Sequence, residues 1–381
     1  MAGLRTVRIS DLGRVVTGKT PPSAQPELFG ELHPFLTPTD IDGFARYIEP
    51  GRFLSPEGRD YQHRLMLPER AICVVCIGAT IGKVCMTGRP SFTNQQINSV
   101  IVNENDHDPF FVYHLLTTLR DELKSNAGGA ATPIINKTAF SEIEVSVPPL
   151  PVQRRIGAIL SAYDELMENS QRRIRLLEAM ARALYREWFV QFHFPGHEKL
   201  LRVASPIGDI PQGWEVKKLG DILELNYGKA LRKEDRRDGD FSVFGSSGIV
   251  GTHDTSLVKG PGIIVGRKGN VGSVFWCDDD FFVIDTAYFV TSSLPLRFLF
   301  YVLPTLNFIN GDAAVPGLSR NQAYTLEILV PPAVLLKRFC NLTDTFERQA
   351  SMLQRQIHNL RRTRDLLLPR LLSEQVNLGE N

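Results

Sequence analysis

Apolar residues recur at alternating steps of four and three along two long stretches of the chain, residues 147–189 and 330–372. A repeat of about 3.5 residues that persists over this length is typical of a coiled-coil seam. The sequence therefore predicts two long helices, each with one apolar seam. The seam positions of the first helix are Ile156, Leu160, Tyr163, Ile174, Leu177 and Leu184, and those of the second are Phe339, Phe346, Leu353, Ile357, Leu360 and Leu367.

The two helical stretches repeat each other without a gap, at a constant offset of 183 residues from Val147 to Val330. Both begin with Val-Pro-Pro, and since proline is accommodated in the first turn of a helix, we expect both helices to start there. We expect Pro195 and Gly196 to stop the first helix, and Pro369 to end or kink the second near its last turn. A chain with the same helix twice suits a two-fold partner or a target read at two separated places.

Each long helix follows a segment in which short β-branched and aromatic runs alternate with Gly and Pro turns, a pattern typical of strands. We expect two compact α+β domains with mixed sheets, linked by the Pro- and Gly-rich stretch 194–213. The expected strands are residues 71–77, 99–102, 262–265, 272–276 and 281–290, and the expected amphipathic helices are residues 109–124 and 296–308.

These globular segments also repeat each other. Gly18-Lys19 aligns with Gly228-Lys229 at an offset of 210, and Gly82 aligns with Gly272 at an offset of 190. Residues 130–133 align with residues 313–316, already at the helix offset of 183. The shrinking offset means that insertions and deletions fall within the globular segments and not in the helices. One architecture is therefore expected twice, with a variable surface on a constant scaffold.

Composition narrows the class of protein. A chain of 381 residues has room for two or more domains, and a net charge of +1 means that any nucleic-acid binding must come from local patches. Five irregularly spaced cysteines do not form a disulfide framework, which favours a reducing compartment. We find neither a stretch of about 20 apolar residues nor the apolar core of a signal peptide. We therefore expect a soluble cytoplasmic protein with no membrane contact.

Several motifs that resemble catalytic or metal sites fail on inspection. The phosphate-loop-like run from Gly78 to Lys83 is one residue short and continues into valine, so a tight turn is expected. Cys73 and Cys76 have zinc-knuckle spacing but lie in an apolar strand without a second pair. No paired carboxylates, nucleophile–base set or dinucleotide fingerprint stands out. We therefore expect a binding protein with no catalytic residues, metal site or cofactor of its own.

Polar side chains in and beside the Gly-rich turns are the candidates for DNA contact, because Arg, Lys, Asn and Gln match guanine and adenine edges in the major groove. The alternative is that they belong to solvated loops of mixed charge, since acidic residues are interspersed among the basic ones of residues 232–238. The candidates are Thr80, Lys83, Asn94, Gln95 and Gln96 in the first domain, and Lys229, Arg232, Arg236, Arg267, Lys268, Asn270 and Thr286 in the second.

Taken together, the chain resembles a specificity subunit of a type I restriction-modification system over nearly its whole length. Each motif is short, and their order together with the duplicated helices makes the set specific. The motifs are Gly18-Lys-Thr-Pro21, Phe35-Leu-Thr-Pro-Thr-Asp-Ile41, Gly78-Ala-Thr-Ile-Gly-Lys83, Asn94-Gln-Gln-Ile97, Thr132-Pro-Ile-Ile-Asn136, Val147-Pro-Pro-Leu-Pro-Val-Gln-Arg-Arg-Ile156, Ile210-Pro-Gln-Gly-Trp-Glu215 and the helix that follows Val330-Pro-Pro332.

The resemblance implies two target-recognition domains that each read one half of a bipartite double-stranded DNA site, separated by two antiparallel coiled-coil helices in a pseudo-two-fold arrangement. It also implies docking of two methyltransferase subunits, with restriction/translocase subunits in the full complex. S-adenosylmethionine, ATP and magnesium then belong to those partners. The implied domains are residues 1–147 and 195–330, and the implied helices are residues 148–194 and 331–381.

Two other classes of function stay open at this point. A stand-alone methyltransferase or nuclease would need donor-binding or metal-binding motifs that the sequence does not show. A coiled-coil scaffold or adaptor without DNA specificity would explain the helices, but it would not explain two duplicated globular domains with variable turns.

Overall fold

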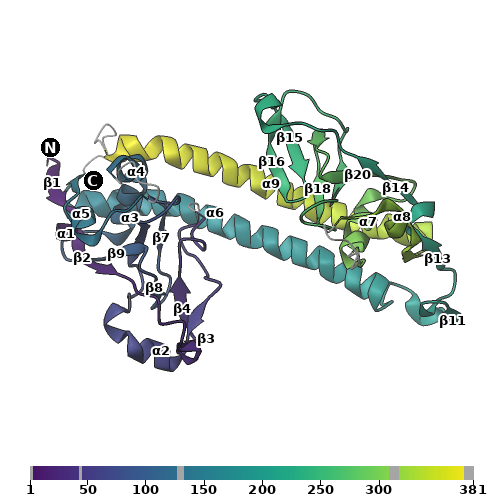
Figure 1. Cartoon of the computed structure of the whole chain (residues 1–381), viewed down its shortest axis with the longest axis horizontal. Coiled ribbons are helices and arrows are strands. Elements are labelled where there is room, and N and C mark those ends of the chain that lie inside the picture. The colour runs from purple at the N-terminus through teal and green to yellow at the C-terminus, as the bar shows by residue number, and fades with distance from the viewer. Residues whose placement is uncertain (1–2, 43–44, 127–132, 309–316, 373–381) are drawn as a thin grey trace. The chain divides into compact units, whose positions relative to one another are not determined.

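The computed structural model describes residues 3–42, 45–126, 133–308 and 317–372 (Figure 1). Residues 130–132 and 313–316, which carry part of the sequence repeat, lie outside the described residues, as do residues 373–381 of the predicted C-terminal region. Contacts divide the chain into two units, Met1–Arg172 with Leu353–Asn381 and Arg173–Met352. Each unit holds one globular part and a portion of both long helices, and the two units are considered separately below.

The long helices are α6 (Leu150–Tyr185), which continues as a π-helix over Arg186–Val190, and α9 (Ala333–Leu372). Both start directly after their Pro-Pro pair, as predicted. In the first unit, Leu160 shares a core with Leu368 and Leu371, while Asp164 pairs with Arg364. In the second unit, Ala181 shares a core with Phe346, and Trp188 packs on Phe339. The residue order shows that the helices are antiparallel within each unit.

None of the predicted seam residues is exposed. Ile156, Leu160 and Leu367 pack in the core of the first unit, and Leu184, Phe339 and Phe346 pack in the core of the second. Pro369 lies inside α9, which continues to Leu372 at the edge of the described residues.

The first unit is built on a four-stranded antiparallel sheet in the order β2-β9-β6-β7. A smaller sheet, in the order β3-β5-β4-β8, includes the parallel pair β4–β8, and β1 pairs with β10 directly before α6. The strands are β1 (Arg5–Arg8), β2 (Gly13–Thr17), β3 (Phe29–Gly30), β4 (His33–Leu36), β5 (Phe53–Leu54), β6 (Ile72–Val75), β7 (Val84–Met86), β8 (Phe92–Thr93), β9 (Ile97–Val102) and β10 (Glu144–Val147). The helices are α1 (Ile9–Leu12), α2 (Pro56–Tyr61), α3 (Pro109–Thr118), α4 (Arg120–Asn126) and α5 (Lys137–Ser141).

The second unit repeats this order in the sheet β14-β20-β17-β18. A three-stranded sheet, β16-β15-β19, contains the parallel pair β15–β19, and β13 pairs with β21 directly before α9. The strands are β11 (Arg202–Ser205), β12 (Gly208–Pro211), β13 (Glu215–Lys218), β14 (Leu223–Tyr227), β15 (Phe241–Gly245), β16 (Gly248–His253), β17 (Gly262–Gly266), β18 (Val274–Cys277), β19 (Phe281–Val283), β20 (Ala287–Ser292) and β21 (Glu327–Val330). The helices are α7 (Leu296–Val302) and α8 (Arg320–Thr325).

The α+β class, the mixed sheets and the internal repeat are confirmed. Local signals explain much of the agreement. Strand β6 is a run of four buried apolar residues, as a strand covered on both faces requires. Helix α3 begins at Pro109 behind Asp108, whose carboxylate accepts a hydrogen bond from the backbone N–H of Phe111 (2.9 Å).

Several predicted elements are interrupted. The predicted helix 109–124 divides at Leu119, where the hydroxyls of Thr117 and Thr118 donate to the carbonyls three residues before them and compete with the helical ladder. The predicted strand 281–290 turns at residues 284–286, because β19 and β20 belong to different sheets. The helix predicted over residues 296–308 ends at Val302 and is followed by a 3-10 turn.

The stretch 194–213 is more than a linker. It contains the hairpin β11–β12, and Phe194, Ile210 and the neighbouring Trp214 are buried in the core of the second unit. Composition alone predicted a loop, because the short strands lie between Pro and Gly residues.

Candidate nucleic-acid interface

In the first unit, one end of the four-stranded sheet brings together the Gly18-Lys19 loop, the turn before β9 and the segment after β6. The N–H of Gly18 donates to the carbonyl of Ile97 (3.2 Å), and the N–H of Lys19 donates to that of Thr93 (3.0 Å). The N–H of Cys76 donates to the carbonyl of Gln96 (2.8 Å), and the carbonyl of Cys76 accepts from the N–H of Ile135 (2.8 Å). We call this set of backbone contacts the glycine edge.

The second unit has a glycine edge with the same four hydrogen bonds. The backbone N–H of Gly228 donates to the carbonyl of Ala287 (3.2 Å), and that of Lys229 donates to the carbonyl of Val283 (2.9 Å). The N–H of Arg267 donates to the carbonyl of Thr286 (2.9 Å), and the carbonyl of Arg267 accepts from the N–H of Leu318 (2.8 Å). Strand register agrees, since Thr17 pairs with Asn98 in the first unit and Tyr227 with Tyr288 in the second. The two edges are therefore equivalent residue by residue.

Glycine is required at the first position of each edge by close approach. A Cβ on Gly18 would overlap the carbonyl oxygen of Thr93, and one on Gly228 would overlap that of Ile284. Because only a hydrogen fits there, the loop is held tightly against the turn and the following lysine is presented at the surface. Both Lys19 and Lys229 are exposed.

The structure uses several first-unit candidates internally. The ammonium of Lys83 donates to the carbonyl of Ile41 (2.6 Å), and the carbonyl of Thr80 closes the turn by accepting from the N–H of Lys83 (3.2 Å). The side chain of the buried Asn94 accepts from the N–H of Gln96 (3.1 Å) and donates to its side chain (2.9 Å). Such a bond shapes an Asx turn. Gln95 is the exposed member, and its amide oxygen accepts from Thr20 (2.7 Å).

In the second unit, the structure brings Arg267, Lys268 and Thr286 together at the glycine edge. The N–H groups of both basic residues donate to the carbonyl of Thr286. Asn270 lies on the exposed turn that follows. In contrast, Arg236 donates to the carbonyl of Val250 in β16 (2.6 Å), and Arg232 is exposed beside a 3-10 turn.

Two residues that the sequence reasoning missed complete this edge. Tyr227 is about half exposed, and the guanidinium groups of Arg267 and Arg320 lie 4.8 and 4.5 Å from its ring centroid. The buried Tyr288 packs against Tyr227 at 5.0 Å. Tyr227 directly precedes Gly228, and this position beside the repeated Gly-Lys motif could have identified it as part of the edge. Arg320 begins helix α8, about 90 residues further along the chain, so nothing local connected it to the edge.

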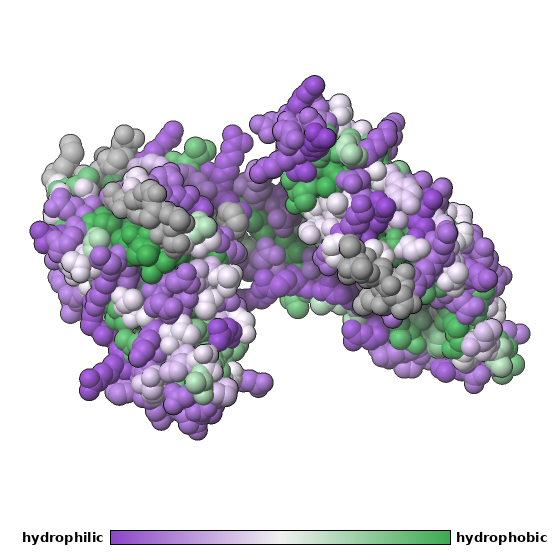
Figure 2. Space-filling view, in the orientation of Figure 1, coloured by the Kyte–Doolittle hydropathy of each residue, from purple (hydrophilic) through white to green (hydrophobic). Residues whose placement is uncertain are grey.

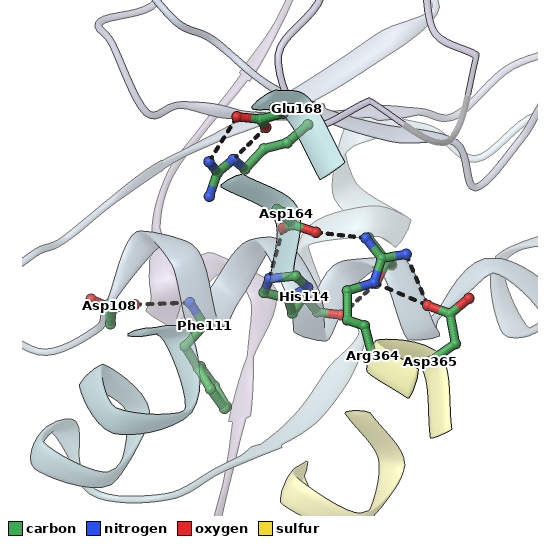
Figure 3. Close-up of polar contacts among 9 residues, drawn as sticks. Asp108, Phe111, His114, Asp164, Glu168, Arg364 and Asp365 are labelled. Carbon is green, nitrogen blue, oxygen red and sulfur yellow. Dashed lines mark hydrogen bonds and ion pairs between the residues drawn. The ribbon is translucent and has the colours of Figure 1, made fainter. Parts of the chain in front are cut away.

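A second polar cluster holds the long helices to the globular part of the first unit (Figure 3). Asp164 of α6 accepts from Arg364 of α9 (2.7 Å), and Nε2 of His114 in α3 lies 3.2 Å from its other oxygen. Nearby, the buried Arg46 forms two hydrogen bonds of 3.2 Å to Glu168. We call the set of Asp164, Arg364 and His114 the carboxylate clamp.

Burial alone would raise the pKa of Asp164, yet contact with His114 and Arg364 outweighs it and holds the pKa below its usual value. The reverse balance holds at Glu168, where burial raises the pKa although Arg46 opposes it.

The second unit is held differently. Glu347, at the position equivalent to Asp164, accepts from the hydroxyl of Tyr301 (2.9 Å), and Arg297 pairs with Asp344 (3.3 Å). Aromatic rings from both long helices and from α7 pack together in this unit. We call these rings the aromatic clamp, and its members are Tyr185, Trp188, Phe189, Phe298, Tyr301 and Phe339.

The motifs that resembled catalytic sites have structural places. Cys73 is buried in β6 opposite Cys85, and Cys76 is buried where the sheet ends. Among the described residues, no group of three His, Cys, Asp or Glu side chains is arranged to hold a metal ion. In the same part of the chain, no helix combines the length and apolar character needed to cross a bilayer. The visible face of each unit is largely hydrophilic (Figure 2).

Comparison with known proteins places these features in a family. The model of the type I restriction modification DNA specificity domain matches residues 1–179 and 211–334. The MjaIX specificity subunit of Methanocaldococcus jannaschii is 26% identical, with 98% of this chain and 93% of that protein covered. The HindI specificity subunit of Haemophilus influenzae is 35% identical, over 45% of this chain and 38% of that protein. The S subunit of a type I system from M. genitalium shares the fold, with a TM-score of 0.59 at 15% identity, and 97% and 96% of the two chains are covered.

Proposed function

Since this chain belongs to the family of type I restriction-modification DNA specificity domains, we propose that it reads a bipartite double-stranded DNA site with one domain per half-site. The target-recognition domains are residues 1–147 and 195–330. The segments 148–194 and 331–381, which contain α6 and α9, hold these domains and dock two methyltransferase subunits. Restriction/translocase subunits complete the assembly, and S-adenosylmethionine, ATP and magnesium act on the partners. The chain itself is non-catalytic.

The observation that carries this proposal is the repeated glycine edge. The two glycine edges have equivalent backbone contacts but carry different side chains, as expected of two domains that recognise different half-sites. Lys19 and Lys229 extend from these edges at equivalent exposed positions, where they suit phosphate contact. A coiled-coil scaffold without DNA specificity would not explain two equivalent glycine edges.

The first experiment maps N6-methyladenine at base resolution in the source genome, with and without this gene. Loss of one bipartite motif on deletion, and its return on complementation, is the expected result. An unchanged methylome, together with no specific DNA binding by the chain when combined with its methyltransferase, would instead favour the scaffold.

A second experiment tests the helices as a spacer. Removing seven residues from the middle of both α6 and α9 shortens each by about 10 Å, which corresponds to about three base pairs of B-form DNA. The methylated motif should keep both half-sites and lose about that much of its spacer. The matched control replaces the same residues with a seam-preserving heptad of equal length. A shortened variant that keeps the original spacer would contradict the role of the helices.

A further inference from the structure

The two glycine edges share some side chains and differ in others. Lys19 and Lys229 occupy one equivalent pair of positions, because their N–H groups form the same hydrogen bond. Lys137 and Arg320 form another pair, since each starts the short helix that follows the edge, two residues after the backbone partner of Cys76 or Arg267. Both pairs keep a positive charge.

Other equivalent positions differ completely. Cys76 in the first unit corresponds to Arg267 in the second, and Cys76 is buried. The cross-strand pair Thr17 and Asn98, joined by a hydrogen bond of 2.6 Å, corresponds to the pair of aromatic rings Tyr227 and Tyr288.

The chemistry of DNA explains why some equivalent positions of the two glycine edges are shared and others differ. Phosphates are the same at every step of the duplex, so two equivalent domains can contact them with the same residue types. Base edges differ between two half-sites of different sequence, so residues that read them must differ as well. Shared cations on the edges therefore suit phosphates, and the differing positions suit bases.

Among the differing positions, Arg267 has the geometry for readout. Its guanidinium is held over Tyr227 at 4.8 Å and Tyr288 at 5.8 Å, and Nη1 donates to the carbonyl of Asp285 (3.1 Å). Among the described residues it has no carboxylate in ion-pair contact. A planar fork of donors held in one orientation, with its charge unpaired, matches O6 and N7 of guanine.

Resting on the proposed function, we propose that Arg267, oriented by Tyr227, reads a guanine in the half-site of the second domain, whereas Lys229 and Arg320 contact phosphates as Lys19 and Lys137 do in the first. The assignment gives Arg267 a sequence-specific role and Arg320, its neighbour across the same ring, a role independent of sequence.

The test uses the full chain with its methyltransferase partner and compares Arg267→Ala with Arg320→Ala. Arg267→Ala should make one G·C position of one half-site degenerate in the methylated motif, with discrimination there reduced by about 5- to 150-fold. Arg320→Ala should leave the motif unchanged, weaken binding to all sequences alike, and reduce the slope of log affinity against log salt by about one. Arg267→Lys keeps the charge without the fork, so it should also relax the motif.

Tryptophan fluorescence verifies that each variant is folded, since the edge bonds of Arg267 to Thr286 and Leu318 are backbone bonds that alanine retains. An unchanged motif in Arg267→Ala, or a changed one in Arg320→Ala, overturns the assignment while the proposed function stands. A wild-type complex that neither binds nor methylates a bipartite site overturns both.

Discussion

In the first unit the long helices meet around a buried carboxylate, whereas in the second they meet around aromatic rings. Asp164 is only 2% exposed and pairs with Arg364 across the two helices. At the equivalent positions of the second unit stand Glu347, which turns to Tyr301, and Ala181, which carries no charge. Tyr185, Trp188 and Phe339 occupy the interior there.

The difference shows that one helix repeat can be held by two kinds of contact. Aromatic rings contribute free energy through the large apolar area that they bury. A buried ion pair contributes little net free energy, because both charges lose water, but removing one partner is costly. We infer that the carboxylate clamp mainly fixes which residues of the two helices face each other, and that the aromatic clamp mainly supplies stability.

The largest effect is expected from Phe339→Ala in the aromatic clamp. Loss of a buried ring that contacts Trp188, Phe189 and Tyr301 should lower the free energy of unfolding of the second unit by about 3–5 kcal/mol. All three tryptophans, Trp188, Trp214 and Trp276, lie in this unit, so urea unfolding followed by their fluorescence reports on it. The control is Met352→Ala at an exposed position of the same helix, with an expected change below about 0.5 kcal/mol. Equal effects of both substitutions would show that the ring contributes little.

Arg364→Ala should destabilise the first unit by about 3 kcal/mol, because Asp164 then stays buried with His114 as its remaining partner. Hydrogen exchange of peptides from α3, α6 and the end of α9 measures the loss. Arg362→Ala, at an exposed position of the same turn, is the control. Replacing Asp164 and Arg364 together by leucine and methionine should restore most of the stability. A double variant as unstable as the single one would show that the pair contributes net free energy.

Acid should lower the free energy of unfolding of the first unit, because protonation of Asp164 weakens the carboxylate clamp. The folded protein holds the pKa of Asp164 below that of an unfolded aspartate, about 3.9. The contribution is therefore complete above that value and is lost as the pH falls through the lowered pKa. Asp164→Asn should differ from wild type most at neutral pH and least once the pH lies below the lowered pKa of Asp164. Glu168→Gln is the contrasting control, because a raised pKa gives the opposite sign. A constant difference between wild type and Asp164→Asn across this range would contradict the prediction.

The smallest effect is expected from Tyr301→Phe, which keeps the ring of the aromatic clamp and removes its hydroxyl bond to Glu347. A loss of about 1 kcal/mol is typical of one such hydrogen bond. The tryptophan transition in urea measures this loss, and the comparison is Thr345→Val, which removes an exposed hydroxyl from α9, the helix that carries Glu347. A loss as large as that of Phe339→Ala would mean that the second unit also depends on a polar contact.

The sequence predicted the long helices and their seams because a periodic pattern is local and repeats many times. It did not predict the carboxylate clamp, since Asp164 and Arg364 lie 200 residues apart and no local pattern links them. Arg364 lies between the seam positions Leu360 and Leu367 at the same four-and-three spacing, but this spacing does not reveal that the arginine contacts a carboxylate of the other helix.

The glycine edge was predicted in part. The Gly-Lys pairs were visible because they repeat, whereas Arg320 is joined to Tyr227 only by the fold. Residue type also proved ambiguous. Lys83 and Asn94 have the donors that DNA contact needs, yet the structure directs them to the carbonyl of Ile41 and to Gln96. Whether a polar side chain serves the backbone or a ligand depends on neighbours that the local sequence does not specify.

The space around Gly18 and Gly228 has a consequence for how such a protein changes over time. A single methyl group at either position would collide with a carbonyl oxygen, while the neighbouring side chains of Lys19, Tyr227 and Lys229 are exposed. Random substitution should therefore be rejected at the two glycines and accepted at their neighbours. New binding preferences can then arise by substitution of a few exposed side chains, while each domain keeps its fold.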